Sequence, residues 1–431
     1  MKTGKKHVSG ILIVYHLPIF YKQGATVQEH IFSFIEHSEF PIYGVNTELA
    51  FPKDLAKYSF DAIILHYSVF AAGHTYEFSS AFLNYLREHH DTPKIAFFQD
   101  DYRNCQKRFK FIDEYNIDTV YTCMPEKYHD LVYKKYSNAS TVFTTLTGYV
   151  TPELPQIARK FRKPSSERTI DIGYRARQLD YYMGIGAQEK HEIGEKFLKI
   201  SQEKGFDLAL DIEVQDQKRL YGDDWYRFMG DCKGMLGVES GVSIIDVEDK
   251  VKEGCDAILK ENPNITFQEI YDMYLHEWDN KLPYRTISPR HFEAAAFKTC
   301  QILFEGEYSG ILKPNVHYIP LKKDFSNIDE VIQAFKNDDF RNQIVENAYN
   351  DFIDTDQYGY RAFINQEFDV YLKSLGLTPQ TIAEDIHQKL LALGNYSNAK
   401  HLKYVVTNFW KWNFPGRKVI VPFVKKMVGH K

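Results

Sequence analysis

The chain has 431 residues, of which 44% are hydrophobic and 15% aromatic, and a formal net charge of −5. Its length predicts two domains, and its apolar content excludes a mainly disordered chain. It contains no run of about 18 apolar residues and no secretory signal, so a membrane-spanning or secreted protein is not expected. The five cysteines are scattered without metal-ligand spacing, which is typical of reduced thiols and predicts a cytoplasmic protein.

The first half alternates apolar strands with helical stretches, the pattern of a doubly wound α/β domain. Strands are predicted at Gly10–Tyr15, Ala62–His66, Lys94–Phe98, Thr119–Thr122 and Thr141–Thr144. Ligands of such sheets bind beyond the carboxyl ends of the strands. His66 and Asp100 lie at two of these ends and are candidate catalytic residues. The alternatives are a structural histidine at the first position and a helix cap at the second.

A segment rich in Pro, Lys and Arg, Thr151–Glu167, is typical of an interdomain linker, and the α/β pattern restarts after it. The predicted organisation is an N-terminal domain at 1–160, a C-terminal domain at 165–375 with an insert at about 246–284, and an extension at 376–431. Two α/β domains of similar size predict a ligand cleft between them.

The first strand of the second half ends in basic residues. Arg175 and Arg177 lie at this end, and Lys190 follows the loop that contains Gly184 and Gly186. Positioned cations of this kind can stabilise a phosphate leaving group. The alternative is a solvated strand end. The chain offers no His or Cys cluster, and its Asp354-Thr-Asp356 stretch lies between helices, so neither a metal nor a cofactor is expected.

The stretch from Ile287 to Gly306 predicts a capped helix that leads into a buried strand. Ser288 is a good N-cap, and a proline follows at the first helical position. Arg290 and Glu293 are three residues apart and share a face near the helix start. There, Arg can pair with phosphate oxygens and the carboxylate can accept from two sugar hydroxyls. The alternative is a solvated surface ion pair.

This stretch, with its Arg290-His-Phe-Glu-Ala sequence, resembles the nucleotide-sugar signature of the group 1 glycosyltransferases of GT-B fold, in particular their spore-maturation-protein-like branch. The continuation from Glu307 to Asp324 is also similar to that branch. The resemblance implies two Rossmann-like domains, with the acceptor on the first and a nucleotide sugar on the second. It also implies retention of configuration without a metal.

The resemblance implies a role for each candidate residue. Those it places around the donor are Arg175, Arg177, Lys190, Arg290, Glu293, Glu305, Tyr308 and Ser309. Glu239 is expected to face the donor sugar, and Asp100 and His66 to lie near the reaction centre. The family usually has two glutamates with seven residues between them, whereas Arg285 occupies the first of these positions here. We expect that the insert separates the two halves of the motif, which leaves Glu239 and Glu293 as its glutamates.

The C-terminal segment is basic and aromatic. Residues 400–431 contain eight of the 53 Lys and Arg and no Asp or Glu, so the rest of the chain has a net charge of −13. Such a segment is suited to the surface of an anionic membrane, here the inner face of the cell membrane. Packing of its aromatic residues on the body is the alternative. Nucleic-acid binding is not expected because the body is acidic.

These observations predict a glycosyltransferase that moves a sugar from a nucleotide sugar to a glycan or lipid-linked acceptor in cell-surface polysaccharide or glycoconjugate synthesis. Two alternatives stay open. A nucleotide-sugar 2-epimerase would share the two-domain fold and need no acceptor. A non-catalytic nucleotide- or glycan-binding protein would explain the departures from the family motif.

Overall fold

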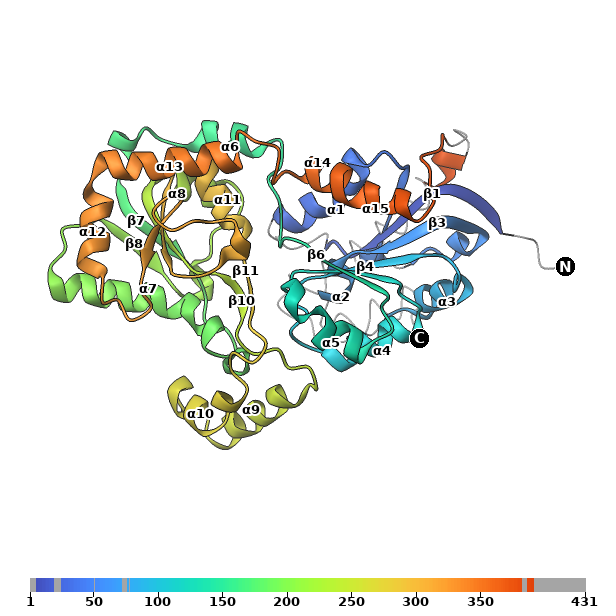
Figure 1. Ribbon diagram of the computed structural model, residues 1–431, viewed down its shortest axis with the longest axis horizontal. Coiled ribbons are helices and arrows are strands. Elements are labelled where there is room, and N and C mark those ends of the chain that lie inside the picture. Colours follow the sequence, from blue (N-terminus) through green and yellow to red (C-terminus); the bar gives the residue numbers. More distant parts are fainter. Residues whose placement is uncertain are drawn as a thin grey trace, which may run out of the picture.

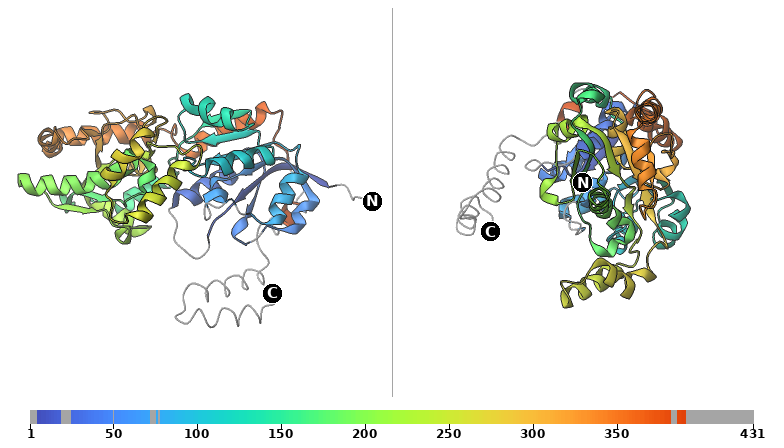
Figure 2. Two further views of the ribbon diagram at one scale, coloured as in Figure 1. Left: turned by 90° about the horizontal axis from the view of Figure 1, so that it is seen from below. Right: turned by 90° about the vertical axis from the view of Figure 1, so that its left-hand side faces the viewer.

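The computed structural model describes residues 5–18, 25–49, 51–71, 76, 78–381 and 386–390. They form two lobes that lie side by side, each built around its own sheet (Figures 1 and 2). All strand pairs within these two sheets are parallel, and helices cover the sheets. The predicted fold class, two Rossmann-like α/β domains, is therefore confirmed.

The first sheet has six strands in the order β2-β1-β3-β4-β5-β6. The strands are β1 (Lys6–Tyr15), β2 (Ile42–Asn46), β3 (Tyr58–Leu65), β4 (Lys94–Phe98), β5 (Thr119–Thr122) and β6 (Thr141–Thr144). Its helices are α1 (Ala25–His37), α2 (Tyr67–Ala71), α3 (Ser80–Glu88), α4 (Cys105–Glu114) and α5 (His129–Tyr136). Every residue of β4 is buried, as expected for a central parallel strand with both faces covered.

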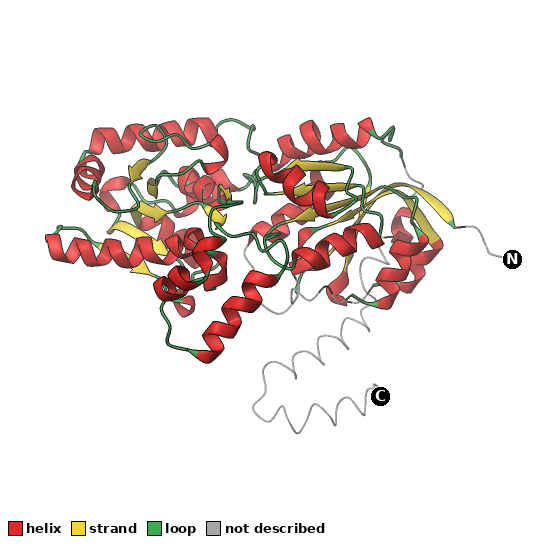
Figure 3. Ribbon diagram, turned by 60° about the horizontal axis from the view of Figure 1, so that its bottom comes forward, coloured by secondary structure: helices red, strands yellow, loops and turns green. Residues whose placement is uncertain are grey.

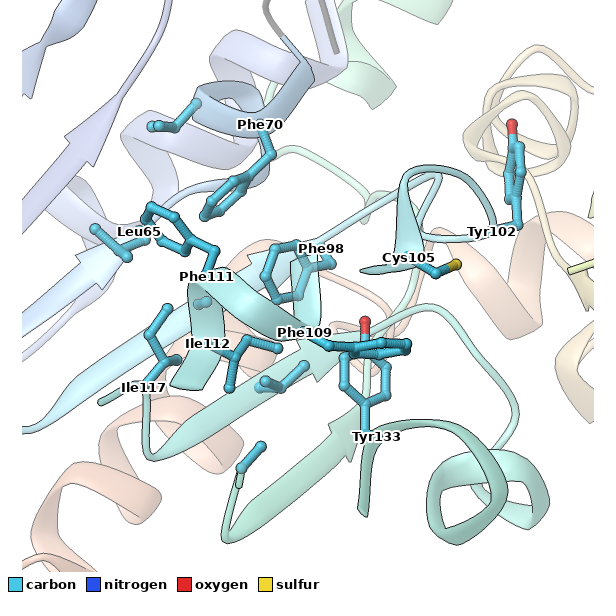
Figure 4. Packing of buried hydrophobic residues seen from close by; sticks show 14 of the residues in the cluster. Leu65, Phe70, Phe98, Tyr102, Cys105, Phe109, Phe111, Ile112, Ile117 and Tyr133 are labelled. Atoms are coloured by element: carbon cyan, nitrogen blue, oxygen red, sulfur yellow. The ribbon is translucent and has the colours of Figure 1, made fainter. Parts of the chain in front are cut away.

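One face of this sheet packs on α4. Figure 4 shows Phe109 and Ile112 of this helix packed close to Phe98 at the end of β4. Tyr102, in the loop before α4, lies apart from them and contacts Tyr284 of the second lobe at a ring-centroid distance of 5.6 Å. The loop between β4 and α4 is thus anchored to its own sheet while it faces the other lobe.

The second sheet has five strands in the order β13-β12-β9-β7-β8. The strands are β7 (Ile170–Arg175), β8 (Leu210–Glu213), β9 (Cys232–Gly237), β12 (Cys300–Phe304) and β13 (Ile319–Leu321). Its helices are α7 (Ile185–Lys204), α8 (Asp223–Asp231), α11 (Pro289–Ala296), α12 (Ile328–Lys336) and α13 (Asp338–Phe352). The carboxyl ends of β7 and β9 and the start of α11 face the first lobe, because their neighbouring residues line a cavity together with first-lobe residues.

The chain passes between the lobes twice. It first crosses before α6 (Leu154–Phe161), and it returns through α14 (Tyr360–Ala362), a π-helical turn at Phe363–Phe368 and α15 (Asp369–Ser374). These last helices fall in the range that the sequence assigned to the second domain. They pack against the first sheet, because Phe363, Phe368 and Leu372 share a buried cluster with Ile11 and Ile13 of β1.

An insert projects from the second lobe toward the first (Figures 1 and 3). It begins with β10 (Ser240–Val242), which pairs antiparallel with β11 (Tyr284–Thr286). Between these strands lie α9 (Lys250–Glu261) and α10 (Phe267–Met273), which begins with a capping box at Thr266 and Glu269. The apolar side of the insert belongs to the same buried cluster as α4 of the first lobe.

Candidate active site

A cavity of about 290 Å³ lies between the two lobes, and we call it the main cavity. The first lobe contributes Asp100, Tyr102 and Arg103 from the loop between β4 and α4. The charged residues that the second lobe contributes are Arg177, Lys190, Arg219 and Arg290. A cleft between two α/β lobes is a common ligand site.

Three cations predicted from the sequence meet in the main cavity. Arg177 follows β7, Lys190 lies on α7, and Arg290 lies in the first turn of α11. Within the described part of the chain, the side chains of Arg177 and Lys190 have no hydrogen-bond or ion-pair partner. Burial lowers the pKa of Lys190 to about 8, an effect that Asp100 opposes and neighbouring arginines reinforce. Uncompensated cations in a cleft favour an anionic ligand.

A second cavity of about 210 Å³ adjoins the first and shares Ser288, Arg219 and Arg290 with it. Glu293 lines this adjoining cavity and accepts a hydrogen bond of 3.0 Å from the indole nitrogen of Trp225. The Arg290 guanidinium lies over the Trp225 ring, 5.1 Å from its centroid. Burial raises the pKa of Glu293, and the indole donor and Arg290 oppose this shift.

The local geometry of α11 confirms what the sequence predicted for its start. The Ser288 hydroxyl accepts a hydrogen bond from the backbone N–H of Arg290, and Pro289 is the first helical residue. The Arg290 guanidinium donates to the carbonyl oxygen of Arg175 at 2.8 Å. Arg290 is exposed, but this hydrogen bond fixes its guanidinium at the end of β7.

First-lobe residues close the adjoining cavity from the opposite side. Ala25 and Thr26, at the start of α1, line it. Glu29, one turn further along α1, has its pKa raised to about 7 by burial and by the carboxylates of Glu293 and Glu153. The carboxyl groups of Glu29 in the first lobe and Glu293 in the second lobe are therefore close enough to repel each other at the adjoining cavity.

Arg175 reaches only the adjoining cavity and is already paired. Its guanidinium donates to the Asp211 carboxylate at 2.8 Å and lies 4.1 Å from the centroid of the Phe228 ring. It also donates to the carbonyl oxygens of Tyr174 and Asp211. This side chain supports the end of β7 and is less available to a ligand than Arg177 or Lys190.

Glu239 lies away from both cavities. Its carboxylate accepts from the guanidinium of Arg285 at 3.4 Å and from the backbone N–H of Tyr308 at 2.8 Å. It lines a third cavity of about 420 Å³, together with Glu305. Arg285, at the position where the family has a glutamate, pairs with Glu239 in this third cavity, which Pro125 and Lys127 of the first lobe also line.

The remaining predicted donor residues also lie outside the main and adjoining cavities. Tyr308 is fully buried, and its hydroxyl donates to the carbonyl oxygen of Phe304 at 2.6 Å. The Ser309 hydroxyl accepts from the backbone N–H of Ile287 at 3.1 Å. Glu305, Tyr308 and Ser309 line neither the main nor the adjoining cavity. Tyr308 instead packs against His291 of α11, with the ring centroids 5.1 Å apart.

Of the two first-lobe candidates, only Asp100 lies at the cleft. It has a left-handed backbone conformation with φ of 56°, and its carboxylate accepts from the Tyr102 hydroxyl at 3.1 Å. His66 is fully buried and hydrogen-bonded to His30 at 2.9 Å and Ser68 at 2.8 Å. Burial keeps the pKa of His66 well below its usual value, so this imidazole is a neutral part of the core.

Sequence reasoning missed Arg103, Arg219 and Trp225. Arg103 follows Asp100 in the same loop, so the rule that ligands bind after strands could have included it. Trp225 lies in the first turn of α8, shortly after Gly222, and no motif singled it out. Arg219 lies in a polar stretch with no pattern that points to the cleft.

The described residues contain no group of three or more His, Cys, Asp or Glu side chains placed to hold a metal ion. Nor do they contain a helix that is both long and apolar enough to cross a membrane. The predicted membrane-contacting segment, at 400–431, lies outside the described residues.

Comparison with known proteins gives distant structural likenesses. No protein-family model and no curated protein matches the chain. One similar solved structure is an alpha-glucosyltransferase in complex with UDP and DNA, with 12% identity, 85% of this chain and 99% of that chain covered, and a TM-score of 0.48. HepE of Anabaena with UDP and glucose has 10% identity, coverage of 84% and 99%, and a TM-score of 0.46. TarM has 12% identity, coverage of 74% and 55%, and a TM-score of 0.40, so the chain spans about half of its length. Likenesses this distant carry no argument about activity. The proposal about activity is therefore based on the residues of the cleft alone.

Proposed function

We propose that the protein is a glycosyltransferase that moves a sugar from a nucleotide sugar to a glycan or lipid-linked acceptor. The observation that carries the proposal is the set of cations in the main cavity beside the partly buried carboxylate of Glu293. Lys190 and Arg177 are unpaired within the described part of the chain, and Arg290 joins them to the cavity of Glu293. A nucleotide diphosphate needs both features, cations for its phosphates and an acceptor for its ribose hydroxyls.

The charges suit transfer chemistry. When the bond between the anomeric carbon and the β-phosphate oxygen breaks, negative charge develops on the departing diphosphate. Lys190, Arg177 and Arg290 would stabilise this charge, and no metal ion is required for that step. The attacking hydroxyl of the acceptor would enter from the first lobe, where Asp100 lines the opposite wall. Retention of configuration remains part of the proposal because it rests on the resemblance.

The adjoining cavity would hold the nucleoside. Glu293 can accept hydrogen bonds from a vicinal diol, and its own carboxylate is fixed by Trp225. The aromatic side chains of Tyr221 and Tyr226 also line this cavity and offer surfaces for a base. A nucleotide would then extend from the adjoining cavity to the main cavity, past Arg290, which lines both.

Calorimetry with UDP, GDP, ADP and CMP tests the proposal. We expect one of them to bind, and Lys190→Ala to weaken its binding at least tenfold, because a phosphate contact is lost. Lys196→Ala is the matched control, since Lys196 lies on the same helix in an exposed pair with Glu192. Failure of all four nucleotides to bind, or equal effects of the two variants, would refute the proposal.

A non-catalytic nucleotide-binding protein is the second candidate. The specific observation in its favour is that Glu239, expected at the donor sugar, pairs with Arg285 and lines neither the main nor the adjoining cavity. Release of free nucleotide from nucleotide sugars in the presence of a broad panel of glycan acceptors distinguishes the two. Binding without any release would favour this second candidate.

A further inference from the structure

We infer that the acceptor carries an oxyanion, a phosphate or a carboxylate, which Arg103 binds on the first-lobe wall of the main cavity. The inference rests on the proposed function, because it names the chemistry of the second substrate of the same site. Arg103 lies in the loop that also carries Asp100, and both residues line the cavity opposite the donor cations.

The charge of the main cavity exceeds what a donor needs. Its described lining has five cations, Arg103, Arg177, Lys190, Arg219 and Arg290, and one carboxylate, Asp100. His291 adds no charge, since burial lowers its pKa to about 4. A diphosphate within a nucleotide sugar brings about two negative charges, one for each phosphate. Arg219 also pairs with Asp216 at 3.5 Å, so about one positive charge remains uncompensated when the donor is bound.

Arg103 has no anionic partner among the described residues; its guanidinium lies over the Tyr102 ring, 5.2 Å from the centroid. Its Nε is buried and has no hydrogen-bond partner, and its Nη2 donates only to the Tyr102 hydroxyl, at 3.3 Å. No carboxylate of the described residues is within ion-pair distance of this guanidinium. Buried polar atoms are nearly always paired, so an unpaired guanidinium nitrogen beside a cavity favours a missing ligand. The planar guanidinium suits an oxyanion that can accept two hydrogen bonds.

The loop that carries Arg103 is held in place from two sides. From the first lobe, the guanidinium of Arg108 donates to the carbonyl oxygens of Asp101 at 2.5 Å and Arg103 at 2.6 Å. From the insert, the carboxylate of Asp249 accepts from the N–H groups that follow this loop, those of Cys105 at 2.8 Å and Gln106 at 3.1 Å. A guanidinium on a loop fixed in this way loses little freedom when it binds an anion.

The position of Arg103 on the first lobe favours a contact with the acceptor rather than with the donor. The donor anchors Glu293 and Arg290 belong to α11 of the second lobe, whereas Arg103 follows β4 of the first. An anion at Arg103 would place a neighbouring hydroxyl of the same molecule near Asp100. The competing role, in which Arg103 reaches across to the donor diphosphate, is separated from the acceptor role by the following test.

The test titrates the full chain with glycerol 3-phosphate, followed by ligand-observed NMR, with and without saturating UDP. Glucuronate serves as the carboxylate arm and glucose as the neutral reference. We expect glycerol 3-phosphate or glucuronate to bind to the UDP-loaded protein, and glucose to bind at least tenfold more weakly. Arg103→Ala should weaken binding of the anion at least tenfold and change UDP affinity less than twofold. Arg103→Lys should retain part of the affinity for the anion, because lysine keeps the positive charge but lacks the planar guanidinium that donates two hydrogen bonds.

Arg87→Ala is the matched control, because Arg87 lies on the same lobe in an exposed pair with Glu114. Thermal melting shows that each variant is folded. Unchanged anion binding in both Arg103 variants would overturn the inference, and so would an equal loss of UDP binding in Arg103→Ala. If UDP does not bind but the anions still bind through Arg103, the proposed donor site fails while the anion site stands. If neither UDP nor the anions bind, both fail.

Discussion

The contact between the insert and α4 gives a prediction whose magnitude follows from the geometry. Asn104, the residue before α4, makes no side-chain cap, and Asp249 of the second lobe supplies the cap instead. Asp249→Ala removes both acceptors and leaves two helix N–H groups unpaired, one of them on fully buried Cys105. Loss of an N-cap costs about 0.5–2 kcal/mol, and an unsatisfied buried donor about 1–3 kcal/mol. We therefore expect a local destabilisation of about 2 kcal/mol.

Hydrogen exchange followed by NMR or mass spectrometry measures this effect where it arises. A local change of about 2 kcal/mol should accelerate exchange of the first amides of α4 by about 30-fold. Asp249→Asn keeps one acceptor oxygen and should have a smaller effect. Asp256→Ala is the control, because Asp256 lies on the same insert in an exposed pair with Lys252. Exchange at the start of α4 that is unchanged in Asp249→Ala would refute the view that the insert caps this helix across the lobes.

Further predictions concern the cleft and its support. Glu293→Gln should weaken binding of the cognate nucleotide at least tenfold by calorimetry while leaving its 2′,3′-dideoxy analogue unaffected, and equal losses would argue against a ribose contact. Nucleotide affinity should be steady up to about pH 8 and fall up to tenfold per pH unit above it, because the protonated form of Lys190 binds the phosphates. Lys190→Met should abolish this pH dependence, and an affinity that rises with pH would contradict it. Arg285→Met should destabilise the second lobe by about 3 kcal/mol in urea, because it leaves buried Glu239 without its cation. Arg87→Met, at an exposed pair, should cost less than about 1 kcal/mol.

Local sequence signals predicted much of the fold. The strands β4, β5 and β6 have the predicted bounds, because each is a short run rich in apolar or β-branched residues. The start of α11 also agrees, since an N-cap and a proline act within a few residues. The edge strand β2 (Ile42–Asn46) was missed, because only two of its five residues are buried.

Contacts between distant segments decided what the sequence could not. Glu239 looked suited to the donor sugar, but its position depends on Arg285, which is 46 residues away. The cap that Asp249 gives to α4 joins residues 144 positions apart. Likewise, the sequence assigned the segment of α15 to the second domain, whereas Leu372 packs against the first sheet. Local patterns predict elements and their buried sides, whereas pairing across the fold needs coordinates.

The crystal structure of a complex with the cognate nucleoside diphosphate tests most directly whether the cleft cations bind the donor's phosphates. We predict that the β-phosphate lies within hydrogen-bond distance of Lys190 or Arg177 and that the ribose hydroxyls contact Glu293. A nucleotide bound in the third cavity, beside Glu239 and Glu305, or on the outer surface of either lobe would contradict the account.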